Sequence, residues 1–386
     1  MKPFLRSFFT TLSILMLTIV AFLAGFFVHE YLSVERASFP ILTQAYEILL
    51  KHGYSDIPPD PTLEHGMIRG MIAAYGDPYT SFVEPIQHEL ETNTLQGTFG
   101  GIGADLSHDS SGYFILYPYP NSPANKAGVR EGDRLLQVNN LEVAPETSMD
   151  EIQATLRGPV GEVVQLRVAR PPEYAEFPIS ITREEIGLPS VTWHIEPSEP
   201  RLGIIQINVI AATTVDEILT ATDDLEGRGA SAFVIDLRNN SGGLLDTGID
   251  IARIYLNSGV IIEQQYRGKP IETYGVDAPG ELADLPLVIF INQNTASAAE
   301  IIAGSLQANH RAILIGTPTY GKDTIQLVFE LGDGSSLHVT AARWWIPNSE
   351  ISSPSIGIQP DILIDPQFTS PIDPYILTAI DYLFPN

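Results

Sequence analysis

Four apolar, strand-like runs in the second half of the chain alternate with helical stretches, and this alternation constrains the fold more than any other feature. The runs are LGIIQINVI, ASAFVIDLR, LPLVIFIN and RAILIG, and the intervening helical patterns begin at Val215, Leu244 and Ser297. Such alternation predicts an α/β domain over residues 185–365, with a largely parallel sheet covered by helices. Loops that leave the carboxyl ends of parallel strands open on one edge of the sheet, where α/β proteins place their sites.

The sequence on either side of these runs predicts three further parts. Residues 38–93 carry helical periodicity and end in the turn-rich segment GDPYTSFVEP, so we expect a small helical segment there. Residues 94–184 carry short strand patterns with one helical stretch, SMDEIQATLRG, and predict a compact β-rich module. Later, a hairpin is expected around Asp333-Gly334, and residues 366–386 are expected to form a closing helical tail.

The N-terminus carries a targeting signal. Lys2 and Arg6 precede an uncharged stretch, residues 7–28, which is long enough to span a bilayer and lacks the short apolar region and small-residue cleavage site of a signal peptide. We therefore expect an uncleaved transmembrane anchor. The positive-inside rule keeps residues 1–6 in the cytoplasm and places the rest of the chain outside it, in a periplasmic or extracellular location.

Charge and composition exclude several classes of function. The formal net charge is −26, and a surface this negative repels nucleic acid. The chain has no cysteine, which excludes disulfides, thiolate metal sites and a cysteine nucleophile. Neither an H-E-x-x-H zinc helix nor a G-x-S-x-G elbow occurs, so we expect neither a metal nor a cofactor.

Three loops at the expected sheet edge carry residues of chemical interest. The first is NNSGG, residues 239–243, whose paired glycines let backbone amides approach a ligand closely. The second is the strand-to-helix junction at Ser297. The third is TYGKD, residues 319–323, which presents Lys322 and is followed by Gln326. In an extended chain Lys322 and Gln326 point to the same side.

These loops have the parts of a serine hydrolase site. A serine hydroxyl is a weak nucleophile unless a base takes its proton, and a lysine amine is such a base only when burial keeps it neutral. Backbone amides from the glycine-rich loop and from the residue after the serine would then bind the oxyanion of a tetrahedral intermediate. The sequence thus predicts a Ser297/Lys322 pair with two oxyanion donors.

Each of these features also has a purely structural explanation. Ser297-x-x-Glu300 is a capping box, in which the serine oxygen and the supporting glutamate pair with amides of the first helical turn. Lys322 would be a solvated loop lysine, and the glycines would form an ordinary turn. These explanations require a coincidence of three adjacent loops, whereas a serine that caps the positive end of a helix can also be a nucleophile.

Four segments carry a resemblance to a known family. DLRNNSGG, NTASAAEIIAGSLQ, GTPTYGKDTIQ and GIQPDILI occur in an order and spacing that resemble the carboxyl-terminal processing peptidases, also called tail-specific proteases. The resemblance implies a serine endopeptidase in which Ser297 is the nucleophile, Lys322 the general base and Gln326 their support. It assigns the oxyanion donors to the amide of Gly242 or Gly243 and to the amide of Ala298. These three residues keep the expected separations of 25 and 4 residues.

The β-rich module resembles the PDZ domain of the same family, through FGGIGADL and SPANKAGVREGDRLLQVNN. In a PDZ domain the bound peptide adds a strand to a sheet edge, and backbone amides hold its terminal carboxylate. The resemblance assigns that loop to Phe99, Gly100, Gly101, Ile102 and Gly103. It implies cleavage of proteins at or near their C-termini, often after the PDZ domain holds the tail, so the partners are substrate C-termini. The sequence leaves open whether a second copy of the chain or an adaptor protein is a further partner.

Four positions depart from the family pattern. Thr295 and Ala299 replace usual serines, Ser241 a usual proline and Asp323 a usual glycine. A carboxylate beside Lys322 favours the charged amine and opposes a general-base role. Asp323 therefore supports an alternative, in which the chain is a catalytically inactive PDZ scaffold that tethers substrates or a partner protease.

Overall fold

The computed structural model describes residues 15–19, 22, 39–58, 61–109, 111–347, 356–365 and 373–385. The chain divides into two compact units, Met1–Met67 and Ile68–Asn386. Apart from residues 15–19 and 22, the predicted membrane anchor at residues 7–28 lies outside the described residues. Among the described helices, none has both the length and the apolar character needed to cross a bilayer.

The segment before the β-rich module is mainly helical, as predicted. Its helices are α2 (Pro40–His52), α3 (Thr62–Tyr75) and α4 (Pro85–Gln96). Prolines begin α2 and α4, where a missing amide hydrogen costs no helical bond. One strand was not predicted: β1 (Ser81–Val83) pairs antiparallel with β18 (Ser336–Trp345). Three residues are too few to show strand alternation, so the sequence gives no sign of this link to the core.

The β-rich module contains a six-stranded antiparallel sheet. Its strands are β3 (Ala104–His108), β4 (Phe114–Pro118), β5 (Asp133–Val138), β6 (Leu141–Glu142), β7 (Val163–Arg170) and β8 (Ala175–Thr182). Two helices accompany it, α5 (Pro123–Lys126) and α6 (Met149–Leu156), and a separate strand pair joins β2 (Thr98–Gly101) to β9 (Glu184–Gly187). Alternate side chains of β4, β5, β7 and β8 fill one apolar core with α6.

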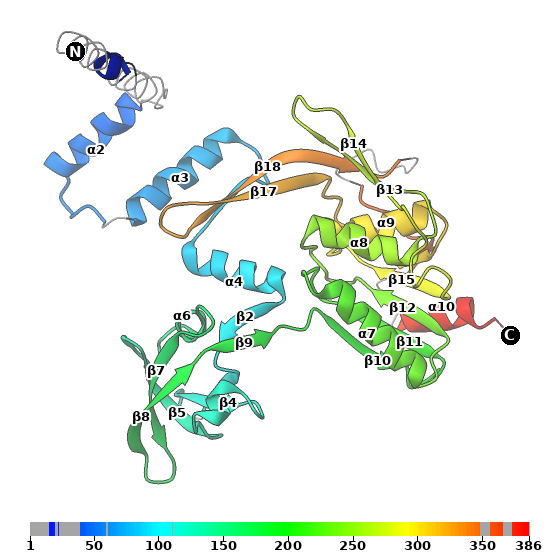
Figure 1. Cartoon of the computed structure of the whole chain (residues 1–386), viewed down its shortest axis with the longest axis horizontal. Helices are drawn as coiled ribbons and strands as arrows, with labels where there is room; N and C mark the ends of the chain where they lie inside the picture. The colour runs from blue at the N-terminus through cyan, green and yellow to red at the C-terminus, as the bar shows by residue number, and fades with distance from the viewer. Residues whose placement is uncertain are drawn as a thin grey trace, which may run out of the picture. The chain divides into compact units, whose positions relative to one another are not determined.

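The predicted strand–helix alternation forms the central sheet of the remaining domain (Figure 1). In spatial order the strands are β10 (Val191–Ile195), β11 (Leu202–Ile207), β12 (Ala232–Asp236), β15 (Leu287–Ile291), β16 (Ile313–Gly316) and β19 (Ile362–Leu363). Neighbours from β11 to β19 are parallel, whereas β10 pairs antiparallel with β11. The predicted parallel arrangement of β12, β15 and β16 is confirmed.

Helices cover both faces of the central sheet, which explains why its strands are almost continuously apolar. On one face lie α7 (Thr214–Gly227), α8 (Leu245–Tyr255) and α9 (Ala298–Ala308), packed on alternate strand residues such as Ile235 and Ile289. The other face, which includes Val234 and Phe290, packs against α10 (Pro374–Leu383). Figure 1 shows α10 in red across the sheet from α8 and α9.

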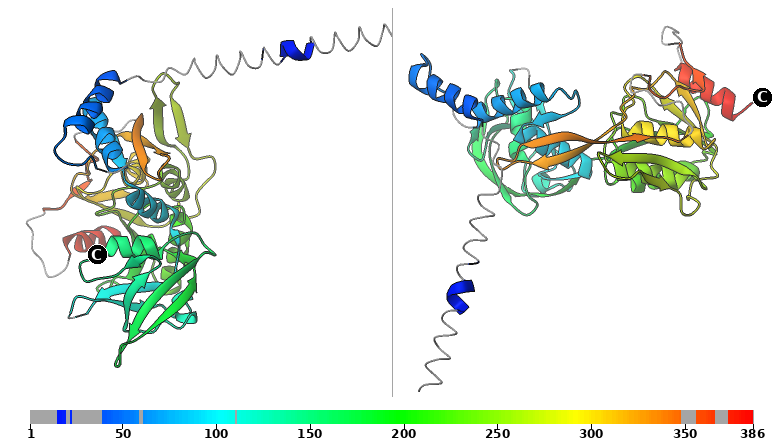
Figure 2. Two further views of the ribbon diagram at one scale, coloured as in Figure 1. Left: turned by 90° about the vertical axis from the view of Figure 1, so that its left-hand side faces the viewer. Right: turned by 90° about the horizontal axis from the view of Figure 1, so that it is seen from above.

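A second sheet of the domain is wholly antiparallel. It runs β1, β18, β13 (Val260–Tyr266) and β14 (Glu272–Gly275), and β17 (Thr324–Glu330) pairs with β18. The β17–β18 hairpin around Asp333-Gly334 is confirmed and is drawn in orange in Figure 2. The expectation of a largely parallel sheet was wrong for the domain as a whole. The second sheet is antiparallel, and the central sheet mixes parallel pairs with the antiparallel pair of β10 and β11. The short connection between β13 and β14 permits only an antiparallel pair, and this pair was missed.

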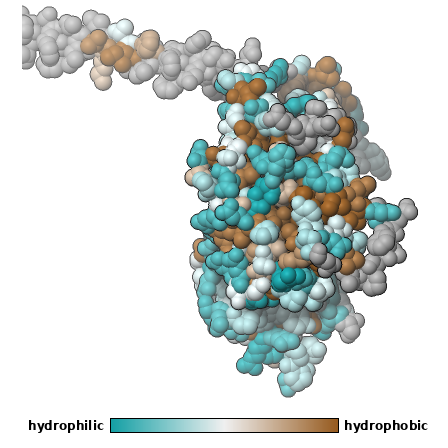
Figure 3. Space-filling model, turned by 90° about the vertical axis from the view of Figure 1, so that its right-hand side faces the viewer, coloured by the Kyte–Doolittle hydropathy of each residue, from teal (hydrophilic) through white to brown (hydrophobic). Residues whose placement is uncertain are grey.

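The surface of the molecule mixes polar and apolar residues. On the face drawn in Figure 3, apolar residues appear in several patches among hydrophilic ones. Apolar residues interspersed in this way are normal on the surface of a folded protein, so we infer no interaction surface from them.

Candidate active site

Three loops that follow β12, β15 and β16 are hydrogen-bonded to one another. We call residues 239–243 the glycine loop, the segment between β15 and Ser297 the serine loop, and residues 319–323 the lysine loop. The amide of Ala296 donates to the carbonyl of Asn240 at 2.9 Å, which connects the serine loop to the glycine loop. The amide of Tyr320 donates to the carbonyl of Thr295 at 3.0 Å, which ties the lysine loop to the serine loop. The expected meeting of the three loops at one sheet edge is therefore present.

Ser297 has a backbone conformation that a capping role does not require. Its φ is 57° and its ψ is −123°, immediately before the first residue of α9. Helix-capping residues normally lie in the β region. A non-glycine residue at this positive φ is strained, and such strain is concentrated at functional sites. The conformation therefore favours a functional serine at the strand-to-helix turn.

Glu300 joins the serine to the lysine loop. Its side chain is buried, with 1% of the residue surface exposed. Oε2 accepts the amides of Ser297 at 2.8 Å and of Lys322 at 2.9 Å, while Oε1 accepts the Thr319 hydroxyl at 2.6 Å and the Gly321 amide at 2.7 Å. Burial raises the pKa of Glu300, and these four hydrogen bonds oppose the rise. One carboxylate thus fixes the backbones of both predicted catalytic residues.

We expect Glu300→Gln to destabilise the protein by about 2 kcal/mol, because whichever way the new amide turns, at least one buried backbone amide faces its NH₂ group. Urea unfolding at neutral pH measures the effect. The matched control is Glu281→Gln, at an exposed loop position. A loss of less than about 1 kcal/mol would mean that the four donors find other partners, and the joining role of Glu300 would be wrong.

Lys322 is held by Gln326 in a partly buried environment. Lys322 Nζ donates to Gln326 Oε1 at 2.6 Å, and Gln326 Nε2 donates to the backbone carbonyl of Tyr79. Burial lowers the pKa of Lys322, and the negative charge of Glu300 partly opposes this shift. Both residues thus lie together as the sequence predicted, and the direction of the pKa shift is the one that a general base needs.

Asp323 pairs with another cation. Its carboxylate lies 3.7 Å from Nη1 of Arg343, and its carbonyl accepts the amide of Trp344 at 2.9 Å. The charge that seemed to oppose a neutral Lys322 thus has an arginine partner. This removes the main observation that supported an inactive scaffold.

The two candidate glycine donors differ in their hydrogen bonding. The amide of Gly242 donates to Asn240 Oδ1 at 2.8 Å and is therefore engaged. Within the described part of the chain, the amides of Gly243 and Ala298 have no hydrogen-bond acceptor. A Cβ on Gly242 would lie 2.9 Å from Ser297 Cβ and 3.1 Å from the Ala298 nitrogen, so the glycine loop passes directly beside the serine. The free amides favour Gly243 over Gly242 as the partner of Ala298.

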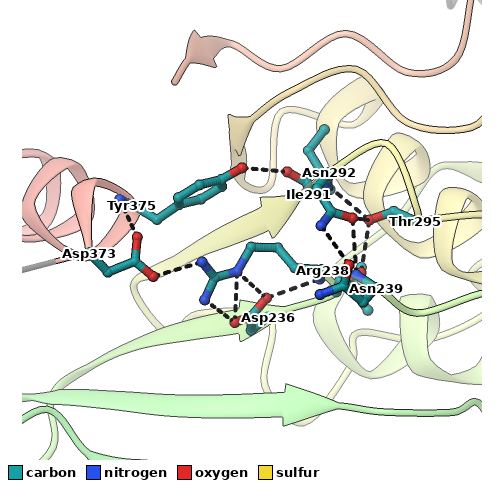
Figure 4. A network of polar contacts seen from close by, with 9 residues as sticks. Asp236, Arg238, Asn239, Ile291, Asn292, Thr295, Asp373 and Tyr375 are labelled. Atoms are coloured by element: carbon teal, nitrogen blue, oxygen red, sulfur yellow. Dashed lines mark hydrogen bonds and ion pairs between the residues drawn. The ribbon is translucent and has the colours of Figure 1, made fainter. Parts of the chain in front are cut away.

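A polar network fastens the start of the glycine loop (Figure 4). Arg238 binds both carboxylate oxygens of Asp236, and its Nη1 donates to Asp373 Oδ2 at 2.7 Å. The amide of Asn239 donates to Asn292 Oδ1 at 3.0 Å. The loop is therefore held by α10 on one side and by the serine loop on the other. The sequence showed the motif DLRNN after a buried strand but not these partners.

A groove of about 280 Å³ lies in the β-rich module, between the start of β3, the end of α6 and the chain after β9. Four of the five residues predicted to hold a peptide line it, namely Phe99, Gly101, Ile102 and Gly103. Gly100 is not among the lining residues. Its carbonyl accepts the amide of Gly158, and a Cβ there would lie 2.0 Å from the Gly158 oxygen, so this glycine allows a close backbone contact.

Arg157 lines the same groove and was missed by the sequence reasoning. Its guanidinium lies 4.4 Å from the centre of the Phe99 ring, and burial lowers its pKa, with the charge of Glu89 opposing. A half-buried arginine at the end of a helix beside an apolar groove suits a carboxylate ligand. Its only sequence signal was its position at the end of the predicted helix SMDEIQATLRG.

Comparisons with known proteins give consistent relatives. The family model described as Peptidase family S41 matches residues 201–364, and a PDZ domain model matches residues 114–170. A carboxyl-terminal-processing protease of Synechocystis sp. is 35% identical over 327 residues, 82% of this chain and 76% of that protein. The carboxy-terminal processing protease CtpA of Bacillus subtilis is 33% identical over 331 residues, 86% of this chain and 70% of that protein. Among solved structures, a photosystem II D1 C-terminal processing protease is 29% identical and covers 84% of this chain and 87% of its own, with a TM-score of 0.46.

Proposed function

Because this chain belongs to the carboxyl-terminal processing proteases of peptidase family S41, we propose that Ser297, Lys322 and Gln326 carry out its peptide cleavage. The chain is a serine endopeptidase with a PDZ domain, and its substrates are proteins. The residue assignment rests on one observation. The buried carboxylate of Glu300 accepts hydrogen bonds from the backbone amides of both Ser297 and Lys322.

The proposed reaction has two stages. The neutral amine of Lys322 takes the proton of the Ser297 hydroxyl as the oxygen attacks the scissile carbonyl carbon. The resulting oxyanion accepts hydrogen bonds from the amides of Gly243 and Ala298. The intermediate expels the amine of the departing peptide, which receives the proton from Lys322. A water molecule then gives a proton to Lys322 and attacks the acyl carbon. The Ser297 oxygen leaves and takes the proton back from Lys322, which releases the new carboxyl terminus and restores the free serine and the neutral amine.

Gln326 supports this cycle by accepting a hydrogen bond from Lys322. An amine can donate to Gln326 Oε1 in its neutral and in its charged form, so the contact holds Nζ in place throughout. A carboxylate in the same position would instead favour the charged amine. The uncharged glutamine therefore suits a lysine that must lose and regain a proton.

We expect the groove beside Phe99 and Arg157 to hold the C-terminal tail of the substrate. Replacing Arg157 with alanine should reduce the preference for a free over an amidated C-terminus by about tenfold, because about 1.4 kcal/mol of carboxylate binding is lost. The measurement compares kcat/KM for two peptides that differ only at that terminus. Arg130→Ala, at an exposed position of the same module, is the control.

Arg157→Lys separates charge from shape, since lysine keeps the charge but not the planar fork. It should keep part of the preference. If Arg157→Ala retains the wild-type preference while Arg130→Ala behaves as expected, the groove does not read the tail carboxylate. Cleavage of both peptides by wild type would still show the peptidase activity.

The location of the enzyme follows from residues 7–28, which we propose as an anchor with the catalytic part outside the cytoplasm. Lys2 and Arg6 before this uncharged stretch support that orientation. Digestion of intact cells by added protease tests it, with cells whose envelope has been opened as the reference. A catalytic part that resists digestion until the cytoplasmic membrane is opened would overturn the orientation.

A further inference from the structure

The turn before β1 is fixed firmly against the second sheet. Thr80 is buried, and its amide donates to Asp77 Oδ2 at 2.9 Å. The amide of Thr340 in β18 donates to Thr80 Oγ1 at 3.2 Å, and the next residue, Ser81, begins the pairing of β1 with β18. Tyr79 is therefore held in one place by its neighbours on both sides.

Tyr79 makes two separate contacts with the predicted catalytic residues. Its carbonyl accepts a hydrogen bond from Gln326 Nε2, and its ring centre lies 5.6 Å from Lys322 Nζ. A glutamine amide has one oxygen and one NH₂ group, so engaging Nε2 with a carbonyl turns Oε1 toward the lysine. The orientation in which Gln326 accepts from Lys322 is thus selected by the backbone of Tyr79.

We infer that Tyr79 is a positioning residue for the serine–lysine reaction, whose carbonyl orients the Gln326 amide and whose ring keeps water from the Lys322 amine. The inference rests on the proposed role of Lys322 as general base. It assigns part of the active site to the segment that precedes the PDZ domain, far from the peptidase motifs in sequence.

Several titratable groups surround this pair, and none reverses the expected effect of the ring. They are Glu300 from α9, His338 from β18, Tyr320 and Asp323 from the lysine loop, and Asp77 from the turn itself. Glu300 favours the charged amine. Burial lowers the pKa of His338, so it is neutral at neutral pH and above, and Asp323 faces an arginine. Burial also raises the pKa of Tyr79, which therefore adds no charge.

The ring acts on Lys322 in two opposing ways. An aromatic face attracts a cation and so favours the protonated amine. The ring also excludes water and so favours the neutral amine. Burial is the largest cause of the lowered pKa of Lys322, and the ring is one of the groups around the amine, so we expect exclusion of water to outweigh the attraction. Removal of the ring should therefore raise the pKa of Lys322.

The test is the pH dependence of kcat/KM for the full-length enzyme with a peptide substrate. We expect the acid limb to move to higher pH in Tyr79→Ala by about half a unit or more, and by less in Tyr79→Leu, which keeps apolar bulk. In Tyr79→Phe, which keeps the ring, the limb should stay at its wild-type position; all three variants keep the backbone carbonyl that Gln326 binds. Tyr75→Ala, an exposed tyrosine in α3, is the control for the loss of a nearby ring.

A shift of the limb separates positioning from stability, because loss of folded protein lowers the whole profile without moving it. If thermal unfolding shows that Tyr79→Ala is not folded, the comparison of the acid limb in Tyr79→Leu with that in Tyr79→Phe decides the question. The inference is wrong if the acid limb of the kcat/KM profile stays in place, or moves to lower pH, in the leucine and alanine variants. A wrong assignment of Lys322 gives a different result, since Lys322→Arg would then remain active whatever the Tyr79 variants do.

Discussion

Replacing Ser297 with alanine is expected to abolish cleavage of an unstructured protein substrate while changing the free energy of unfolding by no more than about 1 kcal/mol, the usual size of a lost cap. Alanine removes the hydroxyl that forms the acyl bond. The amide of residue 297 and its hydrogen bond to Glu300 remain, because the backbone makes that contact. The substitution should therefore abolish catalysis while leaving the protein folded.

Release of peptide fragments and labelling by a fluorophosphonate probe measure the result for Ser297→Ala. Ser258→Ala, at an exposed position before β13, should label and cleave as wild type does. Residual turnover above about a tenth of wild type, a loss of less than about 1.4 kcal/mol in transition-state stabilisation, would exclude Ser297 as nucleophile, provided that no contaminating protease is present.

Lys322→Arg is expected to give a folded and inactive protein. Arginine keeps positive charge and reach but cannot lose its proton near neutral pH, so it cannot act as the base. In wild type, activity should fall on the acid side as Lys322 gains a proton, at a pH below the usual pKa of a lysine because burial lowers it. Cleavage by the arginine variant at near wild-type rate would exclude the serine–lysine mechanism.

The same pKa shift predicts how stability depends on pH. The pKa of Lys322 is lower in the folded protein than in the unfolded chain, so between the two values the unfolded chain binds more protons. The contribution of this group to the free energy of unfolding should therefore rise with pH across that interval. Urea unfolding of wild type against Lys322→Arg isolates this contribution, because the arginine does not titrate there.

The central part of the fold and the main site residues were predictable, since each depends on a local pattern. The strands β12, β15 and β16 are apolar runs of ordinary length, and their parallel order places Ser297 and Lys322 on neighbouring loops. The β1 and β14 strands were not predictable, because three or four residues show no period. The domain was expected to be largely parallel because its antiparallel sheet, apart from the β17–β18 hairpin, was missed.

The missing site residues are those whose role arises from contacts across the chain. Tyr79 and Gln326 are 247 positions apart, and nothing in GDPYTSFVEP indicates that one of its carbonyls meets a catalytic side chain. From the sequence alone, Arg157 is only a residue at the end of a predicted amphipathic helix. Its place in the groove is shown by its stacking on Phe99. The choice between Gly242 and Gly243 needed the hydrogen bond from Gly242 to Asn240.

The pairing of β1 with β18 joins a segment made early in synthesis to one made late. A ribosome makes the chain from its N-terminus, so the turn containing Tyr79 emerges long before its partners in β17 and β18. Until β17 is made, Gln326 is absent, and until β18 is made, β1 has no strand to pair with. The proposed site, with Tyr79 against Gln326, can therefore be complete only after nearly the whole chain has been synthesised.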